Sequence, residues 1–355
     1  MSKRIKVFLG GYVNFLNAQN INCRALSEHL NKERFEVWTM TFWYQNANDF
    51  KKLPGVHYLH AYRPIRFLGW IPYFIGMLRC DVAYLPKGGY MGLCRAVAKL
   101  SGCKIFNTVE GILSASDLAK VPDSDKMLAD YKQCEPHLYA ITRHIQQVVS
   151  KKFGFTFAQK ILYLGVNSKQ FLNSVARQRP LQQVVFIGNN LINKGIDDFF
   201  KISRAFPSLS FHIIGVNNLW NDERLEDYLK REKLTNVTYH GRLDHTRMAS
   251  LLQQMDLMFF PSRSEGFPKV MLETACAGVP TLCYDDYGAQ EWITSGKDGF
   301  VVHTYDEAVA VVEDLVAHPE KLPALSQHAI ELGKRFDWSR HVKDWEEVIE
   351  EIYKG

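Results

Sequence analysis

Two glutamates with seven residues between them, Glu265 and Glu273, form the pattern in this sequence with the strongest chemical implication. The apolar run at residues 255–262 predicts a short buried strand that ends in a serine-containing turn. Pro268 suits the first position of a helix, because its ring fixes φ and its missing N–H would be unpaired there anyway. Gly278 predicts where that helix ends. The segment is therefore predicted to be a strand, a loop that carries Glu265 and a helix that carries Glu273.

The start of this helix is a predicted site for phosphate. The first N–H groups of a helix have no intrahelical partner, and the helix dipole places positive potential at the same end. Glu273 lies about five residues into the helix, roughly 7 Å along its axis. Such a site suits a sugar nucleotide, with the ribose on Glu273, the diphosphate on the amides and the sugar on Glu265. The candidate donor-binding residues here are Gly266, Phe267, Pro268, Lys269, Val270 and Glu273. The alternative is a strand–helix unit with a solvent-exposed glutamate at each end.

The sequence around these glutamates, EGFPKVMLE followed by AGVPTL, resembles the E-x7-E signature of glycosyltransferase family 4. The resemblance implies the GT-B fold, in which two Rossmann-like domains with doubly wound parallel sheets face a central cleft. It also implies transfer of a sugar with retention of anomeric configuration. The resemblance covers most of the chain, because the order of strands, glycine loops and helices on both sides of the motif agrees with it.

Length and charge both predict two domains. The chain has 355 residues, too many for one ordinary core. Residues 1–165 contain 22 Lys and Arg against 11 Asp and Glu, whereas residues 166–355 contain 21 against 27, so the net charges are +11 and −6. The basic first half predicts an anionic partner. Without a zinc finger, a groove-reading helix or an RNA-binding signature, a membrane surface or a phosphate-bearing acceptor is expected rather than nucleic acid.

The cysteines and the first residues predict a cytoplasmic protein. Seven cysteines form no CxxC pair and several lie in apolar surroundings, which is typical of reduced, packed thiols. The apolar run in residues 1–12 has only the length of a strand and breaks at two glycines, so no signal peptide is expected.

The stretch from residue 63 to residue 79 has an apolar core of twelve residues, about half of what a bilayer span requires. The basic residues at its flanks are Arg63, Arg66 and Arg79, and its aromatic residues include Trp70, Tyr73 and Phe74. This composition predicts a docking surface at the inner face of the cytoplasmic membrane for a lipid-linked acceptor. The alternative is a buried helix with a kink at Pro72.

Two positions in the first half are candidate site residues. Residues 5–12 predict a strand that runs into a loop with Gly10 and Gly11. In the family that this chain resembles, the loop faces the sugars, which makes Gly11 a candidate substrate-binding residue; a simple tight turn is the alternative. Family members often carry a His after a later strand, and the matching position here is Glu110. Glu110 would accept a proton from the acceptor hydroxyl or stabilise positive charge, unless it only holds a loop.

The second half departs from the family at one phosphate contact. Family members carry an Arg after the first glycine of this half and a Lys before the next, and both contact the donor diphosphate. Lys194 keeps the lysine, but Asn189, after Gly188, stands in place of the arginine, which removes a bidentate phosphate donor. By the same resemblance, Gly215 is expected near the nucleobase. Any of three cations would then have to compensate, Lys269, Arg263 or Arg242, and the sequence does not choose among them.

The predicted fold class is α/β, with four segments. They are an acceptor-binding domain at 1–165, a linker at 166–182, a nucleotide-sugar-binding domain at 183–335 and a helix at 336–355 that crosses back to the first domain. That helix carries one apolar face, formed by Trp338, Val342, Trp345, Ile349 and Ile352.

The predicted function is transfer of a hexosyl group from a nucleotide sugar to a hydroxyl of a glycan or lipid-linked acceptor, in surface polysaccharide or glycoconjugate biosynthesis. Glu265, Glu110 and Lys194 are the candidate catalytic residues. Neither a cofactor nor a metal is expected, because Lys194 and the helix dipole stabilise the departing diphosphate. Two alternatives remain: a nucleotide-sugar epimerase of related fold, which needs no acceptor, and a catalytically silent GT-B binding partner, which Asn189 and Glu110 suggest.

Overall fold

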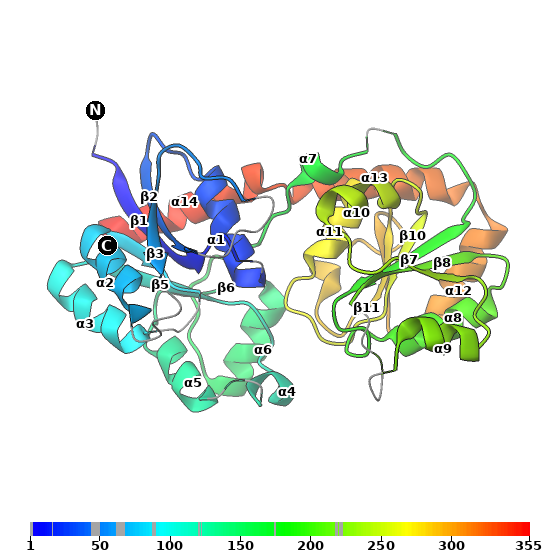
Figure 1. Ribbon diagram of the computed structural model, residues 1–355, viewed down its shortest axis with the longest axis horizontal. Helices are drawn as coiled ribbons and strands as arrows, with labels where there is room; N and C mark the ends of the chain where they lie inside the picture. The colour runs from blue at the N-terminus through cyan, green and yellow to red at the C-terminus, as the bar shows by residue number, and fades with distance from the viewer. Residues whose placement is uncertain are drawn as a thin grey trace. The chain divides into compact units, whose positions relative to one another are not determined.

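The chain forms two compact units (Figure 1). The computed structural model describes residues 3–15, 17–43, 50–61, 68–86, 90–119, 121, 123–173, 175–216, 219 and 223–355. The first unit comprises Met1–Leu164 and Trp338–Gly355, and the second comprises Gly165–Asp337. The residues predicted as a linker, 166–182, therefore group with the second unit.

The first unit contains a parallel sheet, with six strands among the described residues in the order β3-β2-β1-β4-β5-β6. The strands are β1 Ile5–Tyr12, β2 Phe35–Phe42, β3 Val56–Ala61, β4 Val82–Tyr84, β5 Lys104–Val109 and β6 Leu138–Ala140. The helices are α1 Ala18–His29, α2 Ile71–Arg79, α3 Met91–Ser101, α4 Ala115–Leu118, α5 Ser124–Lys132, α6 Arg143–Phe153 and α14 Trp338–Lys354. Buried β-branched and aromatic side chains on both faces of the central strands explain why helices cover both sides.

The helix α14 belongs to the core of the first unit. All five residues of its predicted apolar face are buried, and it packs against α1, β1 and β4. The Trp345 ring contacts the Tyr84 ring edge-on, with centroids 5.1 Å apart. Glu346, also buried, accepts hydrogen bonds from the Asn31 backbone at 2.8 Å and from Arg34 at 2.9 Å. This face is therefore part of the core of the first unit.

The strand β1 continues through Gly10 and Gly11 instead of ending before them. A β-bulge between Leu9 and Tyr12 absorbs the irregularity. A Cβ on Gly11 would lie 2.7 Å from the Sγ atom of Cys23, so α1 packs directly on this backbone. The predicted glycine loop is thus a strand end, and the glycines serve close packing between β1 and α1.

The structure bears on only part of the membrane-docking prediction for residues 63–79. Arg63 and Arg66 lie outside the described residues. Tyr73 is buried edge-on against Phe8, so it does not face solvent as a membrane anchor would. Pro72 lies in the first turn of α2, where it is compatible with the helix, and it does not kink it.

The second unit repeats the architecture. Its parallel sheet has six strands among the described residues, in the order β12-β11-β10-β7-β8-β9. The strands are β7 Gln183–Gly188, β8 Ser210–Gly215, β9 Val237–Tyr239, β10 Leu257–Phe260, β11 Thr281–Tyr284 and β12 Gly299–Val302. The helices are α7 Ser168–Phe171, α8 Ile196–Ala205, α9 Leu225–Arg231, α10 His245–Leu252, α11 Lys269–Cys276, the 3-10 helix η3 Ala289–Glu291, α12 Tyr305–Ala317 and α13 Lys321–Arg335. The predicted class, two α/β domains with parallel sheets, is confirmed.

Among the described residues, the helices are too short or too polar for any of them to cross a bilayer. All seven cysteines are buried thiols, as the sequence predicts.

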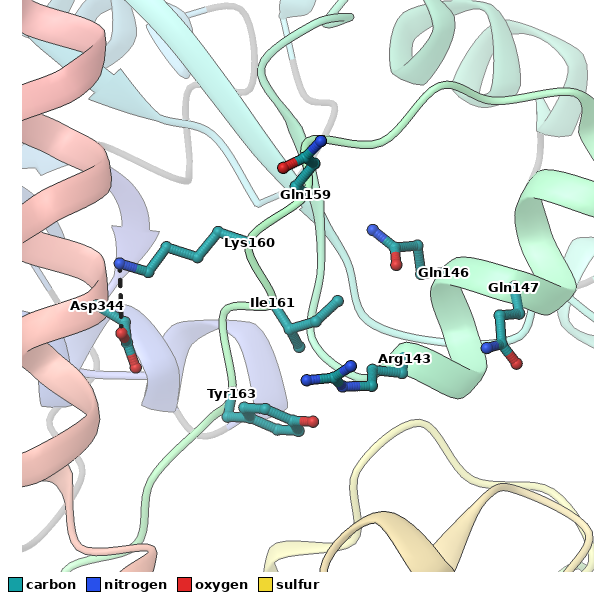
Figure 2. Close-up of a pocket in the computed structure, with 8 residues that line it drawn as sticks. All are labelled: Arg143, Gln146, Gln147, Gln159, Lys160, Ile161, Tyr163 and Asp344. Carbon is teal, nitrogen blue, oxygen red and sulfur yellow. Dashed lines mark ion pairs between the residues drawn. The ribbon is translucent and has the colours of Figure 1, made fainter.

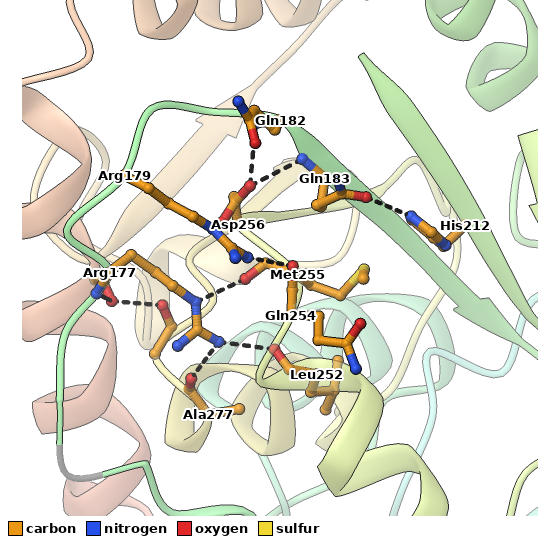
Figure 3. A network of polar contacts seen from close by, with 12 residues as sticks. Arg177, Arg179, Gln182, Gln183, His212, Leu252, Gln254, Met255, Asp256 and Ala277 are labelled. Atoms are coloured by element: carbon orange, nitrogen blue, oxygen red, sulfur yellow. Dashed lines mark hydrogen bonds and ion pairs between the residues drawn. The ribbon is translucent and has the colours of Figure 1, made fainter. Parts of the chain in front are cut away.

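Arg177 fastens the ends of two helices in the second unit (Figure 3). Its guanidinium is buried and donates to the backbone oxygens of Leu252 at 2.7 Å, Met255 at 2.8 Å and Ala277 at 3.0 Å. Leu252 ends α10 and Ala277 follows α11, so one side chain satisfies carbonyls that a helix leaves unpaired at its end.

Asp256 completes this network from the residue before β10. Its carboxylate is fully buried and accepts from the Arg179 side chain at 2.7 Å and from the backbone N–H groups of Gln182 and Gln183 at 3.0 and 2.8 Å (Figure 3). The chain that enters β7 is therefore tied to the start of β10, which leads to the loop of Glu265.

Arg177→Met is expected to lower the free energy of unfolding by about 3 kcal/mol, because three backbone oxygens lose the hydrogen bond that the buried guanidinium donates. Urea unfolding followed by circular dichroism measures this change. Arg247→Met, on the exposed side of α10, is the control and should leave the midpoint unchanged. Equal midpoints for the two variants would contradict the role given to Arg177.

Candidate functional site

A close contact between two loops builds the predicted donor site in the second unit. Gly195 has a φ of +76°, and a Cβ on it would lie 2.2 Å from the carbonyl oxygen of Pro261. Only glycine fits there. The loop after β7 therefore lies against the chain that leaves β10, and Lys194 is carried to the loop of Glu265.

Lys194 and Glu265 form an ion pair. The side chain of Glu265 is 9% exposed and that of Lys194 is 26% exposed. The ammonium group also lies over the Phe260 ring, 5.6 Å from its centroid. The two residues predicted to contact the diphosphate and the sugar are thus neighbours, although 71 positions separate them in the chain.

The helix α11 begins at Lys269, one residue after the first position that the sequence predicts. Pro268 occupies the N-cap position, and no side chain caps the helix. The first backbone hydrogen bond of the helix runs from the Met271 N–H to the Pro268 oxygen at 3.0 Å. Phe267 packs on Trp292 and Phe336, with centroids 5.1 and 5.8 Å away, which fixes the loop immediately before the helix. Gly266, Lys269 and Val270 are half-buried at this end of the helix, where N–H groups lack intrahelical partners.

Glu273 is half-buried on α11. Burial raises the pKa of its carboxyl above the ordinary value, and the positive charges of His245 and Lys269 oppose that rise. An incompletely compensated carboxylate lowers stability unless a ligand uses it.

The carboxyl ends of β7 and β8 bring two more predicted residues together. Gly188 and Gly215 are partners in the parallel register, and a Cβ on Gly215 would lie 1.8 Å from the Gly188 oxygen. The Gly215 N–H donates to Gly241 at 3.0 Å, so Arg242 follows at the same edge of the sheet and is exposed. Asn189 is exposed one residue after β7.

Arg263, a candidate to replace the missing arginine, is engaged elsewhere. It donates to Asp286 at 3.0 Å and lies 3.7 Å above the Tyr284 ring. Asp285 accepts a hydrogen bond from Gln290 at 2.7 Å. Within the described ranges, no group of three or more His, Cys, Asp or Glu side chains is placed to hold a metal ion.

Glu110 follows β5 in the first unit and accepts several hydrogen bonds. The hydroxyls of Tyr84 and Thr108 lie 3.0 and 3.3 Å from its Oε1 atom, and Asn22 Nδ2 donates to Oε2 at 3.1 Å. Tyr84 is fully buried, and burial together with the charge of Glu110 raises the pKa of its phenol. The phenol therefore stays protonated and donates to the carboxylate.

Sequence reasoning missed these partners of Glu110. Asn20 and Asn22, buried near the start of α1, are polar where a Rossmann helix usually buries apolar residues, and this was the available signal. Asn20 Oδ1 accepts from the Tyr12 N–H at 3.0 Å, and its buried Nδ2 has no partner among the described residues. The turn thus links the end of β1, with Gly11, to Glu110.

The predicted site residues therefore form two groups. Gly11 and Glu110 lie at the carboxyl edge of the first sheet, and the other predicted residues lie in the second unit. This is the edge at which open α/β sheets bind ligands.

Residues 169–332 match the family model described as glycosyl transferases group 1. An uncharacterised glycosyltransferase of Methanocaldococcus jannaschii is 23% identical over 194 residues, covering 54% of this chain and 53% of that protein. A glycogen synthase of Mycobacterium tuberculosis is 27% identical over 202 residues, covering 54% and 48%. The chain thus aligns with about half the length of these curated relatives.

Two solved structures share the fold over nearly the whole chain. Sucrose-phosphate synthase of Thermosynechococcus elongatus superposes with a TM-score of 0.78 at 15% identity, covering 99% of this chain and 100% of that one. Anabaena HepE in complex with UDP superposes with a TM-score of 0.76 at 13% identity, covering 98% and 100%. The fold is therefore GT-B.

Glu273→Gln is expected to raise the melting temperature of the ligand-free protein at about pH 8, because burial disfavours the ionised form of the wild-type carboxyl. A carboxyl whose pKa is raised on folding favours the folded state below its ordinary range and loses that contribution as the pH rises through the folded value. The difference should therefore shrink toward about pH 4. Melting curves across this range measure it, with Glu313→Gln, exposed on α12, as the control. A melting temperature that falls at about pH 8 would refute the expectation.

Proposed function

Because residues 169–332 of this chain match the family model of glycosyl transferases group 1 and the fold is GT-B, we propose that the protein transfers a hexosyl group from a nucleotide sugar to a hydroxyl group with retention of configuration. The Lys194–Glu265 pair at the loop contact of Gly195 and Pro261 is the observation that carries the proposal. It joins a cation for a phosphate to an acceptor for sugar hydroxyls.

In this proposal the donor lies on the second unit. The diphosphate binds the free N–H groups at the start of α11 and Lys194, while Glu273 binds the ribose hydroxyls. A bound diphosphate competes with Glu265 for Lys194, which releases the carboxylate toward the sugar. The departing diphosphate is stabilised by these fixed charges, and no metal takes part. UDP is the first nucleotide to test, because HepE was solved with UDP and with UDP-glucose.

The first unit holds the acceptor in this proposal. Hydrogen bonds from Asn22, Tyr84 and Thr108 suit an ionised Glu110. That carboxylate accepts the proton of the attacking hydroxyl as the new glycosidic bond forms. The acceptor is a glycan or a lipid-linked glycan of a surface polysaccharide or glycoconjugate pathway.

A surface on α2 and α3 supports contact with an anionic membrane. These helices pack side by side (Figure 1). The exposed large apolar residues on and beside them are Trp70, Leu78, Tyr90 and Leu100, which define the α2–α3 patch. Neither helix contains an acidic residue, whereas exposed Arg79 and Lys99 add positive charge. We propose that this patch rests on the inner face of the cytoplasmic membrane.

One observation favours a second candidate, a catalytically silent GT-B binding partner. Asn189 stands where the family has a phosphate-binding arginine, and Arg263 is paired with Asp286. A silent protein would bind no donor, whereas an epimerase would bind it and act without an acceptor.

Nucleotide binding and turnover test the proposal together. UDP at a hundredfold excess over its dissociation constant should raise the melting temperature by roughly 5 °C, with GDP and ADP as comparisons. Glu265→Gln should lower turnover of the sugar conjugate about 100-fold, yet bind the free nucleoside diphosphate at least as well, because Lys194 is released. Turnover should be unaffected by EDTA.

Glu313→Gln is the matched control for charge removal and should change neither quantity. Equal loss of binding and turnover in Glu265→Gln would make Glu265 a binding residue only. No melting shift with any nucleotide or its sugar conjugate would favour the silent partner.

Flotation with lipid vesicles tests the α2–α3 patch. Wild-type protein should float with vesicles that contain phosphatidylglycerol and not with pure phosphatidylcholine. Leu78→Ser combined with Leu100→Ser should weaken this binding about tenfold, because two exposed leucines no longer leave water. Val316→Ser, which removes an exposed aliphatic side chain from α12, is the control. Equal flotation of the double variant and the wild type would contradict the proposed surface.

A further inference from the structure

A polar hollow of about 400 Å³ opens on the first unit, and none of the predicted site residues lines it (Figure 2). Side chains of α6, of the segment 159–163 and of α14 line it, and Ile161 is its single apolar lining residue among the described ones. A volume of this size lies in the range of roughly 300–1,000 Å³ that small-molecule sites occupy.

The wall of the hollow is rigid. Ile161 forms a parallel bridge with Ala140, and the Leu162 N–H donates to the Ala140 oxygen at 3.0 Å. The segment thus extends the sheet beyond β6. The Trp345 indole of α14 donates to the Tyr163 oxygen at 3.2 Å, which holds the segment from the other side.

Planar amides dominate the lining. Arg143, Gln146 and Gln147 lie at helix positions i, i+3 and i+4, so they share one face of α6. Gln146 Nε2 donates to the Ala158 oxygen at 2.9 Å, which fixes the amide and leaves Oε1 as an acceptor. The side chains of Gln147 and Gln159 are exposed and, among the described residues, hydrogen-bond to no protein atom.

The charges in the hollow nearly cancel. Lys160 pairs with Asp344 at 3.4 Å and with Glu347. Arg143 is the other cation of the lining, so neither a polyphosphate nor a metal ion is favoured. Amides that both donate and accept, together with the Tyr163 ring, match a neutral ring with many hydroxyl groups.

The hollow lies at a defined distance from Glu110. Val109, Ala140 and Ile161 are lateral neighbours, since β5 pairs with β6 and Ile161 bridges Ala140. Two strand spacings, ~10 Å, therefore separate the end of β5 from the wall of the hollow. This is longer than a single pyranose ring.

We propose that the hollow binds a neutral sugar residue of the acceptor, one residue away from the sugar whose hydroxyl is glycosylated. The acceptor is then a disaccharide or a longer glycan and not a single sugar. This inference rests on the proposed function, because it places Glu110 at the reacting hydroxyl.

Saturation-transfer NMR with four neutral disaccharides, maltose, cellobiose, lactose and N,N′-diacetylchitobiose, tests the subsite on the full chain. At least one should bind the wild type. Gln147→Ala combined with Gln159→Ala should reduce its signal at least about fivefold, since several hydroxyl contacts are lost. Gln327→Ala, exposed on α13, is the control and should match the wild type.

The UDP melting shift separates this inference from the proposed function. It should be the same in the wild type, the double variant and the control. Absence of binding by all four disaccharides, or equal binding by the double variant, overturns the subsite even when UDP binds. Absence of the UDP shift in the wild type contradicts the proposed function instead.

Discussion

The contact between Gly195 and Pro261 is the constraint on which the candidate site of the second unit depends. A side chain on residue 195 would overlap the Pro261 oxygen, and the positive φ at this position excludes most other residues. The approach sets the position of Lys194 beside Glu265. The absence of a Cβ atom at residue 195 thereby allows a charged pair to form beyond the carboxyl ends of β7 and β10. Any charged group of a ligand placed there must compete with this pair.

The buried charged residues of the second unit are of two kinds: some have their charge satisfied by hydrogen bonds, and one does not. Arg177 and Asp256 are buried and bind mainly backbone groups, with the Arg179 side chain as a further partner of Asp256, so they fix the ends of α10 and α11 and the start of β10. Glu273 is the opposite case, because its burial is incompletely compensated and the pKa of its carboxyl is raised. A rigid surrounding is what allows an unfavourable carboxylate to persist at a fixed place.

In the first unit, hydrogen bonds hold the carboxylate of Glu110 in place. Glu110 receives hydrogen bonds from Tyr84, Thr108 and Asn22, which belong to β4, β5 and α1. Tyr84 in turn packs against Trp345 of α14, so the chain's last helix supports the residue that orients Glu110. Loss of the α14 packing would therefore affect the position of Glu110 through the contact between Trp345 and Tyr84.

The sequence by itself determined the local units. The apolar run before Glu265, Pro268 and Gly278 predicted the strand, loop and helix correctly, because strand length and the backbone limits of proline and glycine are local properties. The apolar face of α14 was equally readable from its period.

Tertiary structure decided the rest, since contacts between distant segments depend on strand order and helix rotation. Lys194 meets Glu265 across 71 residues, Tyr73 turns inward onto Phe8 despite its membrane-like neighbours, and Glu110 acquires its donors only because β4, β5 and α1 meet. Local sequence fixes which groups are available, whereas packing alone fixes which of them touch.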